Sequence, residues 1–263
     1  MKKRNVKKKR MAKVVITVLI LLLGAVSLVS CGQTEIIQPD VKQPVSRRAA
    51  QAEQKVAKGI AAHKKSINVL DYDLKYSDLK ERLQEFTNNH PTLFYIGGFR
   101  YRILVKETKD GKKKKRVEAI EPSYLIGKKE TQAAKKKFNR KVSQIVRGAK
   151  KQSDFKSKIL YVNNAICYGT NYSGDTGVPF NQTAYGVLVK GRGACQSYAQ
   201  AFKVIMDRLD IPCEYRYSND KEHIWNIVKY KGRWYHVDVT WNDSYGYPRY
   251  LLSKSHPKSS VSY

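Results

Sequence analysis

The pattern of apolar and polar positions predicts helices over much of the chain. Small and apolar residues recur every three or four positions between residues 49 and 67, as in a helix that buries one face. A second helix is predicted from Ser77, a capping residue, to the proline stop at Pro91. Residues 128–151 and 155–167 have the same spacing, and the first of these segments is strongly basic. We expect each apolar stripe to face a core.

Strand-like alternation interrupts these helices before residue 128. Residues 93–108 and 115–126 alternate between apolar and polar positions, and they flank the dipeptide Asp110-Gly111. An Asp-Gly pair between two such runs predicts a β-hairpin with its turn at these residues. The lysine run at 109–116 is accordingly interpreted as a hairpin turn and not as a binding motif.

The C-terminal part of the chain is predicted to be a helix followed by a sheet. A loop rich in turn formers at 171–181 precedes a helix at about 194–209. Three strands are then predicted at 213–220, 224–232 and 233–243, with a Lys-Gly turn between the last two. Helices and strands in separate blocks favour an α+β fold over an alternating α/β fold.

The first thirty residues have the pattern of a secretory signal. Residues 1–13 carry eight Lys/Arg and no acid, residues 14–29 are almost wholly apolar, and LVSC at 28–31 resembles a bacterial lipobox. We expect cleavage before Cys31, a lipid on Cys31, and a chain held at the extracytoplasmic face of a bacterial cell membrane. An uncleaved signal anchor is the alternative, and it also leaves the remaining chain outside the cytoplasm.

These patterns together predict four parts of the chain. They are a lipoprotein signal peptide at 1–30, a polar tether at 31–48, an N-terminal α+β extension with a β-hairpin at 49–151, and a catalytic core at 152–263.

The net charge of +29 restricts the partners of this chain. Removal of residues 1–30 leaves about +21, so the remaining chain is still strongly basic. Nucleic acid is one partner of such a surface, but the polyanions nearest to an exported, lipid-held protein are lipid headgroups and wall polymers. We therefore expect anionic wall polymers or headgroups as partners, and no nucleic acid.

The number of cysteines indicates a thiol that has no structural partner. Acylation of Cys31 leaves Cys167, Cys195 and Cys213, an odd number for an exported chain. An odd thiol indicates either pairing with another molecule or a free reactive group, and Cys167 and Cys213 could pair and leave Cys195 free. No CxxC or clustered His/Cys spacing indicates a zinc site, and we expect no cofactor.

Cys195 lies where the glycine-rich segment 191–194 gives way to the predicted helix. Amide N–H groups at a helix start favour an anion, and the thiolate is the reactive form of cysteine. The small residues before Cys195 leave room for a substrate backbone to approach. A buried core thiol is the alternative, since free cysteine is also a common small core residue.

A cysteine nucleophile needs a base, and histidine serves this role near neutral pH. Among the five histidines, His223 alone follows a polar loop and precedes an apolar strand. Asp238 lies between two valines of the predicted strand at 233–243, where a carboxylate needs a partner such as a histidine. His236 shares a face with Asp238 and is the rival base, which we rank behind His223.

Three blocks, GRGACQSYAQAF, HIWNIV and GRWYHVDVTWND, together resemble the transglutaminase-like core of bacterial proteins. The resemblance covers about residues 162–252, and the extension before it is more loosely similar to regions preceding this core in lipid-anchored or secreted members. It implies a papain-like core in which a nucleophile helix packs on an antiparallel sheet. It also implies a triad of Cys195 as nucleophile, His223 as base and Asp238 as orienting acid. Ile224 departs from the alanine that the family often has there.

The resemblance further implies a thioester between the cysteine and an acyl donor. Water then gives hydrolysis and a lysine amine gives cross-linking, depending on how well the site excludes water. We expect a hydrolase that cleaves peptide or amide bonds of a protein or peptide substrate at the cell surface. Transamidation and a non-catalytic binding module are the alternatives. The oxyanion is expected on the Cys195 N–H and one side-chain donor, for which Gln182 and Tyr198 are candidates.

Overall fold

The structure is a computed structural model that describes residues 18–21, 47–108, 110–220 and 222–259. Cys31 and the predicted cleavage site before it lie outside these residues, as do most of the predicted signal peptide and most of the predicted tether. The signal, the lipid and the tether stay predictions. Within the described ranges, no helix combines the length and the apolar character that crossing a membrane requires.

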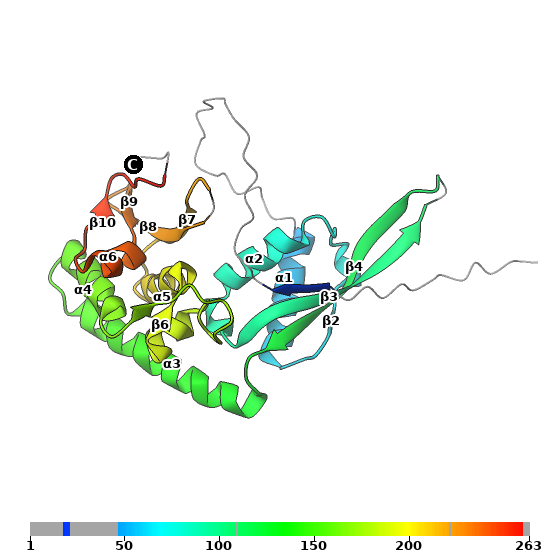
Figure 1. Cartoon of the computed structure of the whole chain (residues 1–263), viewed down its shortest axis with the longest axis horizontal. Helices are drawn as coiled ribbons and strands as arrows, with labels where there is room; N and C mark the ends of the chain where they lie inside the picture. The colour runs from blue at the N-terminus through cyan, green and yellow to red at the C-terminus, as the bar shows by residue number, and fades with distance from the viewer. Residues whose placement is uncertain (1–17, 22–46, 109, 221, 260–263) are drawn as a thin grey trace, which may run out of the picture. The chain divides into compact units, whose positions relative to one another are not determined.

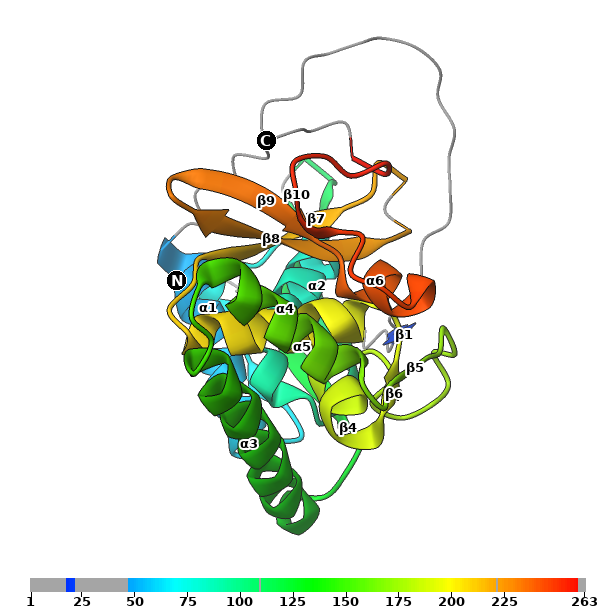
Figure 2. The same ribbon diagram turned by 90° about the vertical axis from the view of Figure 1, so that its left-hand side faces the viewer.

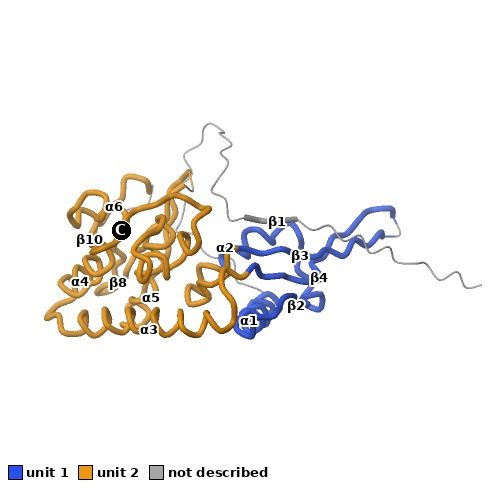
Figure 3. The backbone as a smooth tube through the Cα atoms, turned by 60° about the horizontal axis from the view of Figure 1, so that its bottom comes forward, with its two compact units in different colours: residues 1–20, 45–85, 98–123 blue, residues 21–44, 86–97, 124–263 orange. Residues whose placement is uncertain are grey.

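The chain divides into two compact units, coloured separately in Figure 3. Unit 1 comprises residues 1–20, 45–85 and 98–123, and unit 2 comprises residues 21–44, 86–97 and 124–263. The helix at 128–150 therefore lies in unit 2, whereas the sequence analysis assigned it to the extension. The predicted boundary between extension and core at residues 151/152 stays a prediction. The last change between the two compact units comes earlier in the chain, at residues 123/124.

Unit 1 contains a four-stranded sheet in the order β1-β3-β4-β2 (Figure 1). Its elements are β1 (Val18–Leu21), α1 (Arg47–Ala61), β2 (Ile67–Asn68), η1 (Leu70–Tyr72), α2 (Leu79–Asn89), β3 (Ile96–Glu107) and β4 (Lys113–Tyr124). Four of them, β1, α2, β3 and β4, have one to four residues that are assigned to unit 2. Strand β1 falls in the predicted signal peptide, so cleavage before Cys31 would leave the order β3-β4-β2.

The hairpin predicted around Asp110-Gly111 is confirmed. Thr108 donates its N–H to the Lys112 carbonyl at 2.8 Å, and Gly111 has a left-handed φ of 78° that favours glycine. The helix predicted at 49–67 is present as α1 but ends at Ala61. It ends early because His63 turns to a positive φ and Ile67 begins the edge strand β2.

Unit 2 holds the chemistry-bearing residues. Its remaining elements are η2 (Pro91–Leu93), α3 (Lys128–Lys150), α4 (Phe155–Cys167), β5 (Asn171–Tyr172), η3 (Gly186–Lys190), β6 (Arg192–Gly193), α5 (Cys195–Arg208), β7 (Cys213–Tyr217), β8 (Ile224–Tyr230), β9 (Arg233–Val237), α6 (Val239–Tyr245) and β10 (Leu251–Ser253). The helices predicted at 128–151, 155–167 and 194–209 are confirmed as α3, α4 and α5.

Helix α5 lies at the centre of unit 2. Every residue from Ser197 to Met206 is buried except Lys203, so the helix has no continuous solvent face. A helix that is buried on all sides must be covered by several other elements. Figure 2 shows the sheet β10-β9-β8-β7 on one side of α5 and helices α3 and α4 on the other. Of these elements, β7, β8, α3 and α4 contact α5 directly. This is the expected α+β arrangement of a nucleophile helix packed on an antiparallel sheet.

The sheet of unit 2 is antiparallel throughout and is built around β8. Strands β8 and β9 form the predicted hairpin at Lys231-Gly232, with Tyr230 opposite Arg233. Residues 224–228 of β8 are all buried, as expected for a central strand covered on both faces. The β8–β9 ladder ends at the pair Asn226 and Val237, which places His223 and Asp238 just beyond its last rung.

The strand predicted at 233–243 is wrong in its second half. Strand β9 ends at Val237, and residues 239–245 form helix α6. The cause is local, because the Asp238 carboxylate accepts the Trp241 N–H at 3.0 Å and caps the helix. The alternation of valine, aspartate and valine that suggested a strand is therefore the junction between a strand and a helix.

Candidate active site

Cys195 is the first residue of α5 and follows the short strand β6. The N-cap residue before it, Ala194, is extended and has no side-chain acceptor, so the first-turn amides are not capped by a side chain. Uncapped N–H groups at a helix start favour an anion beside them. The thiol is partly buried and not in a disulfide. The helix start predicted from the glycine-rich segment is thus confirmed at this cysteine.

The start of α5 is held by the loop that precedes it. Asn181 accepts the Ala194 N–H at 2.9 Å and also the Ser197 hydroxyl through its backbone carbonyl. Gly193 allows this close approach, because a Cβ there would lie 2.6 Å from the Ser197 Cβ. In parallel register, Tyr172 of β5 lies opposite Gly193. The backbone at Cys195 is therefore fixed by contacts on both sides.

His223 is buried directly before β8, and both its backbone and its ring are held. Ser218 donates its N–H to the His223 carbonyl and accepts the His223 N–H with its hydroxyl, each at 2.9 Å. The imidazole stacks with Trp225 and Trp241, with ring centroids 5.7 and 5.4 Å away. The two tryptophans thus fix the plane of the ring.

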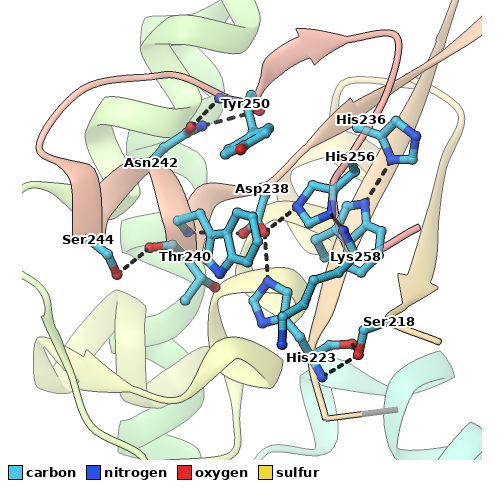
Figure 4. A network of polar contacts seen from close by, with 12 residues as sticks. Ser218, His223, His236, Asp238, Thr240, Asn242, Ser244, Tyr250, His256 and Lys258 are labelled. Carbon is cyan, nitrogen blue, oxygen red and sulfur yellow. Dashed lines mark hydrogen bonds and ion pairs between the residues drawn. The ribbon is translucent and has the colours of Figure 1, made fainter. Parts of the chain in front are cut away.

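Asp238 is fully buried and lies next to this imidazole (Figure 4). Its Oδ2 lies 2.6 Å from His223 Nε2, while its Oδ1 caps α6. Burial alone would raise the pKa of this carboxyl, but the hydrogen bonds from His223 and His256 outweigh burial and lower it. Asp238 is therefore an ionised, immobile acceptor for the base.

The ring of His223 connects this carboxylate to the thiol. It is hydrogen-bonded to Asp238, and Cys195 is close enough to influence its pKa. Because Nε2 faces Asp238, Nδ1 is the ring nitrogen that remains for the sulfur. Burial favours the neutral imidazole, yet the interactions with Asp238 and Cys195 outweigh burial and raise the pKa of His223 to about 9. The three residues singled out from the sequence thus lie together in the order thiol, imidazole, carboxylate.

The rival base His236 occupies a different place. It lies on β9, fully buried, and its Nδ1 accepts the Trp225 Nε1–H at 2.9 Å. Its described bond therefore supports the tryptophan behind the site. His223 is the ring whose pKa the Cys195 thiol helps to raise.

His256 belongs to the site and was missed by the sequence analysis. It follows β10, is buried, and its Nε2 lies 3.0 Å from Asp238 Oδ2. Figure 4 shows the rings of His223 and His256 both directed at this carboxylate. No periodicity or motif surrounds His256 in the sequence, so no local signal indicated its position.

The two candidate oxyanion donors have different surroundings. Tyr198 is fully buried, and its hydroxyl donates to Asp243 Oδ2 at 2.6 Å, so this donor is already engaged. Gln182 is partly exposed and follows Asn181, the residue that holds the start of α5. Gln182 stays a candidate, together with the Cys195 N–H.

The disulfide considered between Cys167 and Cys213 is not formed, and both are free thiols. Cys167 ends α4 with its sulfur 3.7 Å from the Val239 carbonyl, and burial, aided by Asp243, raises its pKa to about 12. Burial also raises the pKa of Cys213 far above its ordinary value. Both are therefore protonated and unreactive at neutral pH.

His223, Asp238 and His256 together could also hold a metal ion, since their ligand atoms lie within 4.8 Å of one another. The separations of 2.6 and 3.0 Å are ordinary hydrogen-bond lengths. In addition, the Lys258 N–H occupies Nδ1 of His256, which leaves Nε2 of that ring as a proton donor. These three residues therefore fit a network of hydrogen bonds better than a set of metal ligands.

One sequence model of a known family matches part of the chain. The sequence model of the transglutaminase-like superfamily matches residues 139–239, which include Cys195, His223 and Asp238. No protein of curated function matches the chain.

Several solved structures resemble the chain at low sequence identity. A TGase is 12% identical over 55% of this chain and 44% of its own, with a TM-score of 0.36. A protein of Cytophaga hutchinsonii described as a cysteine protease is 13% identical over 53% of this chain and 62% of its own, with a TM-score of 0.34. A protein of Parabacteroides distasonis described as a protease is 9% identical over 52% of this chain and 35% of its own, with a TM-score of 0.32.

The chain thus spans less than two thirds of each of these structures. The sequence match and the arrangement of unit 2 lead to one assignment. Residues 139–239 of this chain are a transglutaminase-like domain.

Proposed function

We propose that this chain is a thiol enzyme that cleaves peptide or amide bonds of a protein or peptide substrate through Cys195, His223 and Asp238. The observation that carries the proposal is the buried His223 ring, which is hydrogen-bonded to the buried Asp238 carboxylate and whose pKa is raised by both this carboxylate and the Cys195 thiol. A binding module has no need of a buried base between a thiol and an acid.

The first half of the reaction would follow from this geometry. His223 Nδ1 takes the proton of the thiol, and the sulfur attacks the carbonyl carbon of the substrate. The oxygen gains a negative charge, which the Cys195 N–H and one further donor stabilise. The imidazolium then gives its proton to the leaving amine, the C–N bond breaks, and a thioester remains on Cys195.

The second half would return the enzyme. Neutral His223 takes a proton from water, the hydroxide attacks the thioester, and the thiolate leaves with the proton restored to the Cys195–His223 pair. A lysine amine in place of water would give a cross-link, which is the transamidation alternative. A peptide donor with a labelled amine separates these outcomes, because hydrolysis yields a carboxylate and transamidation incorporates the label.

The proposal places the enzyme at the extracytoplasmic face of a bacterial cell membrane, anchored by lipid on Cys31. The basic start, the apolar run at 14–29 and the lipobox at 28–31 support it. In cells, Cys31→Ala should move the chain out of the lipid-labelled membrane fraction. Unchanged fractionation and unchanged mass at the N-terminus would contradict the anchor.

The test of the enzyme is the alkylation rate of Cys195 against pH, measured by peptide mass spectrometry on the full chain in detergent. The other thiols, Cys167 and Cys213, serve as internal references because they are protonated. We expect rapid alkylation well below pH 7, since His223 is positively charged there, and its loss in His223→Ala. Cys195→Ala should abolish turnover while the fold is kept.

The opposite result is equally clear. An alkylation rate that rises only near the ordinary thiol value of ~8.5, and equally in His223→Ala, would contradict the enzyme and favour a binding module. Turnover retained in Cys195→Ala would overturn the assignment of the nucleophile.

A further inference from the structure

His256, which follows β10, is buried among aromatic side chains. It is 2% exposed, and its ring lies flat on Trp225, with centroids 4.1 Å apart and an interplanar angle of 18°. Trp241 and Tyr250 also contact the ring, with centroids 4.6 and 5.0 Å away. This packing holds the imidazole in one orientation and directs Nε2 at Asp238.

The hydrogen bonds of His256 define which nitrogen carries its proton. The backbone N–H of Lys258 donates to Nδ1 at 3.3 Å, so Nδ1 is an acceptor. Nε2 therefore bears the proton and donates it to Asp238 Oδ2 at 3.0 Å. The tautomer follows from this network of bonds.

Asp238 consequently receives donors on both oxygens. Oδ2 accepts from His223 and from His256, and Oδ1 accepts the Trp241 N–H. Three donors from three different segments fix both the plane and the rotation of the carboxylate. The bond from His256 also withdraws negative charge from Oδ2. It therefore weakens the hydrogen bond that the same oxygen accepts from His223.

We propose that His256 is a positioning residue, which holds the Asp238 carboxylate through Oδ2 and thereby sets how strongly Asp238 binds the proton of His223. This inference rests on the proposed function, and it adds a residue that lies outside the matched domain at 139–239. A purely structural role is the alternative, since the ring also fills the space between Trp225 and Tyr250.

Other titratable groups surround the pair and must be held constant in a test. They are Cys195 at the start of α5, Cys167 at the end of α4, and His236 of β9, whose ring centroid lies 5.8 Å from that of His256. Substitutions at position 256 leave each of these residues in place. The readout is therefore the titration of His223 itself.

Two variants separate positioning from packing. His256→Phe keeps an aromatic ring on Trp225 but removes the donor to Asp238, whereas His256→Gln loses the stack but offers an amide N–H near the place of Nε2. Without the donor, Asp238 holds the His223 proton more strongly. The titration of His223 should then move up by about 0.7 pH unit, the equivalent of one ordinary hydrogen bond.

The experiment is a pH titration of the His223 ring by NMR on the full chain carrying Cys195→Ala, alone and combined with each variant at 256. The proposal expects an upward shift in His256→Phe that His256→Gln largely reverses. A His223 titration that is unchanged in His256→Phe would overturn it and assign His256 to packing. This readout is independent of turnover, so it tests His256 even if the proposed enzyme activity fails.

A second pair covers a Phe variant that does not fold. His256→Asn and His256→Gln are both amides, but the asparagine side chain is too short to reach Asp238 Oδ2. A shift in His256→Asn relative to His256→Gln supports positioning, and identical His223 titrations in the two would overturn it.

Discussion

At the scale of single residues, Asp238 connects the stability of unit 2 with its chemistry. One carboxylate oxygen caps α6 through the Trp241 N–H, and the other accepts from His223 and His256. If the Asp238 side chain were mobile, its carboxylate would have to be oriented again before each turnover. Here the cap fixes it, because rotation of the carboxylate would break the start of a helix.

This double role predicts different effects for two substitutions of Asp238. Asparagine is also a good helix cap, so Asp238→Asn should keep α6 but lower turnover by roughly a hundredfold or more, because the amide favours the wrong tautomer of His223. Asp238→Ala should lower turnover and also cost about 1 kcal/mol of unfolding free energy through the lost cap.

Turnover and urea unfolding of both variants check this prediction. Wild-type turnover in Asp238→Asn would mean that another group orients His223. Equal stability of Asp238→Ala and Asp238→Asn would mean that the cap contributes little.

Sequence reasoning reached those site residues that carry a local signal. Cys195 lies at a glycine-rich helix start, and His223 and Asp238 flank recognisable strands. His256 could not be reached, because its position depends on β10 returning to β9 and on a stack with Trp225, which are non-local contacts. The engagement of the Tyr198 hydroxyl is also non-local, because its hydrogen-bond acceptor is Asp243, 45 positions away in the sequence.

At the scale of elements, the loop before α5 holds the backbone next to Cys195 in place. The Asn181 side-chain amide donates to the carbonyls of Ser173 and Asp175 at 3.0 and 2.7 Å, and its backbone carbonyl receives the Ala194 N–H. One residue thus ties the loop at 173–181 to the residue before Cys195. The loop can move only if these bonds break.

We predict that Asn181→Ala loosens this loop without unfolding unit 2. The lost side-chain bonds should cost about 1 to 2 kcal/mol of unfolding free energy and speed hydrogen exchange at the amides of residues 171–181 and 194–197. Turnover should fall because Cys195 is less well placed.

Asn171→Ala is the matched control, since that side chain is exposed in the neighbouring β5. Equal exchange in both variants would contradict the anchoring role of Asn181.

Elements with a strong period were predicted well, and short elements were not. Helices α2, α3 and α4 bury one apolar stripe each, which sequence periodicity reports directly. The two-residue strands β5 and β6 depend on each other, so neither has a pattern of its own. Helix α6 was predicted as a strand because its start is decided by the Asp238 cap.

At the scale of the whole molecule, the compact units are not continuous segments of the chain. Residues 86–97 belong to unit 2, although the chain enters and leaves them through unit 1. In unit 2, Phe94 contacts Phe138 of α3 and stacks on Tyr185, with centroids 5.0 and 4.5 Å away. Composition changes along the chain could not reveal such a crossing, because it follows from tertiary contacts.

Helix α3 separates its apolar and basic residues into two faces. The buried face is apolar around Phe138, and Glu130, the one acid of the helix, is used at Gly127, whose N–H it accepts at 2.7 Å. The exposed basic residues are Lys128, Lys129, Lys136, Lys137, Arg140, Arg147 and Lys150. A face of one charge sign attracts polyanions at low salt. The α3 face is therefore a place in unit 2 where an anionic partner would meet several exposed cations.

We therefore predict that the α3 face binds an anionic wall polymer, for which soluble poly(glycerol phosphate) is the probe. Replacing Lys136, Lys137, Arg140 and Arg147 by glutamine in the full chain in detergent should weaken binding about tenfold or more at low salt and flatten its salt dependence. The matched control replaces the four lysines at 112–115, which removes the same charge from the hairpin of unit 1. Titration calorimetry at several salt concentrations compares the two. Equal losses would mean that net charge alone attracts the polymer, whereas a loss confined to the α3 variant, and unaffected by Cys195→Ala, assigns binding to this face.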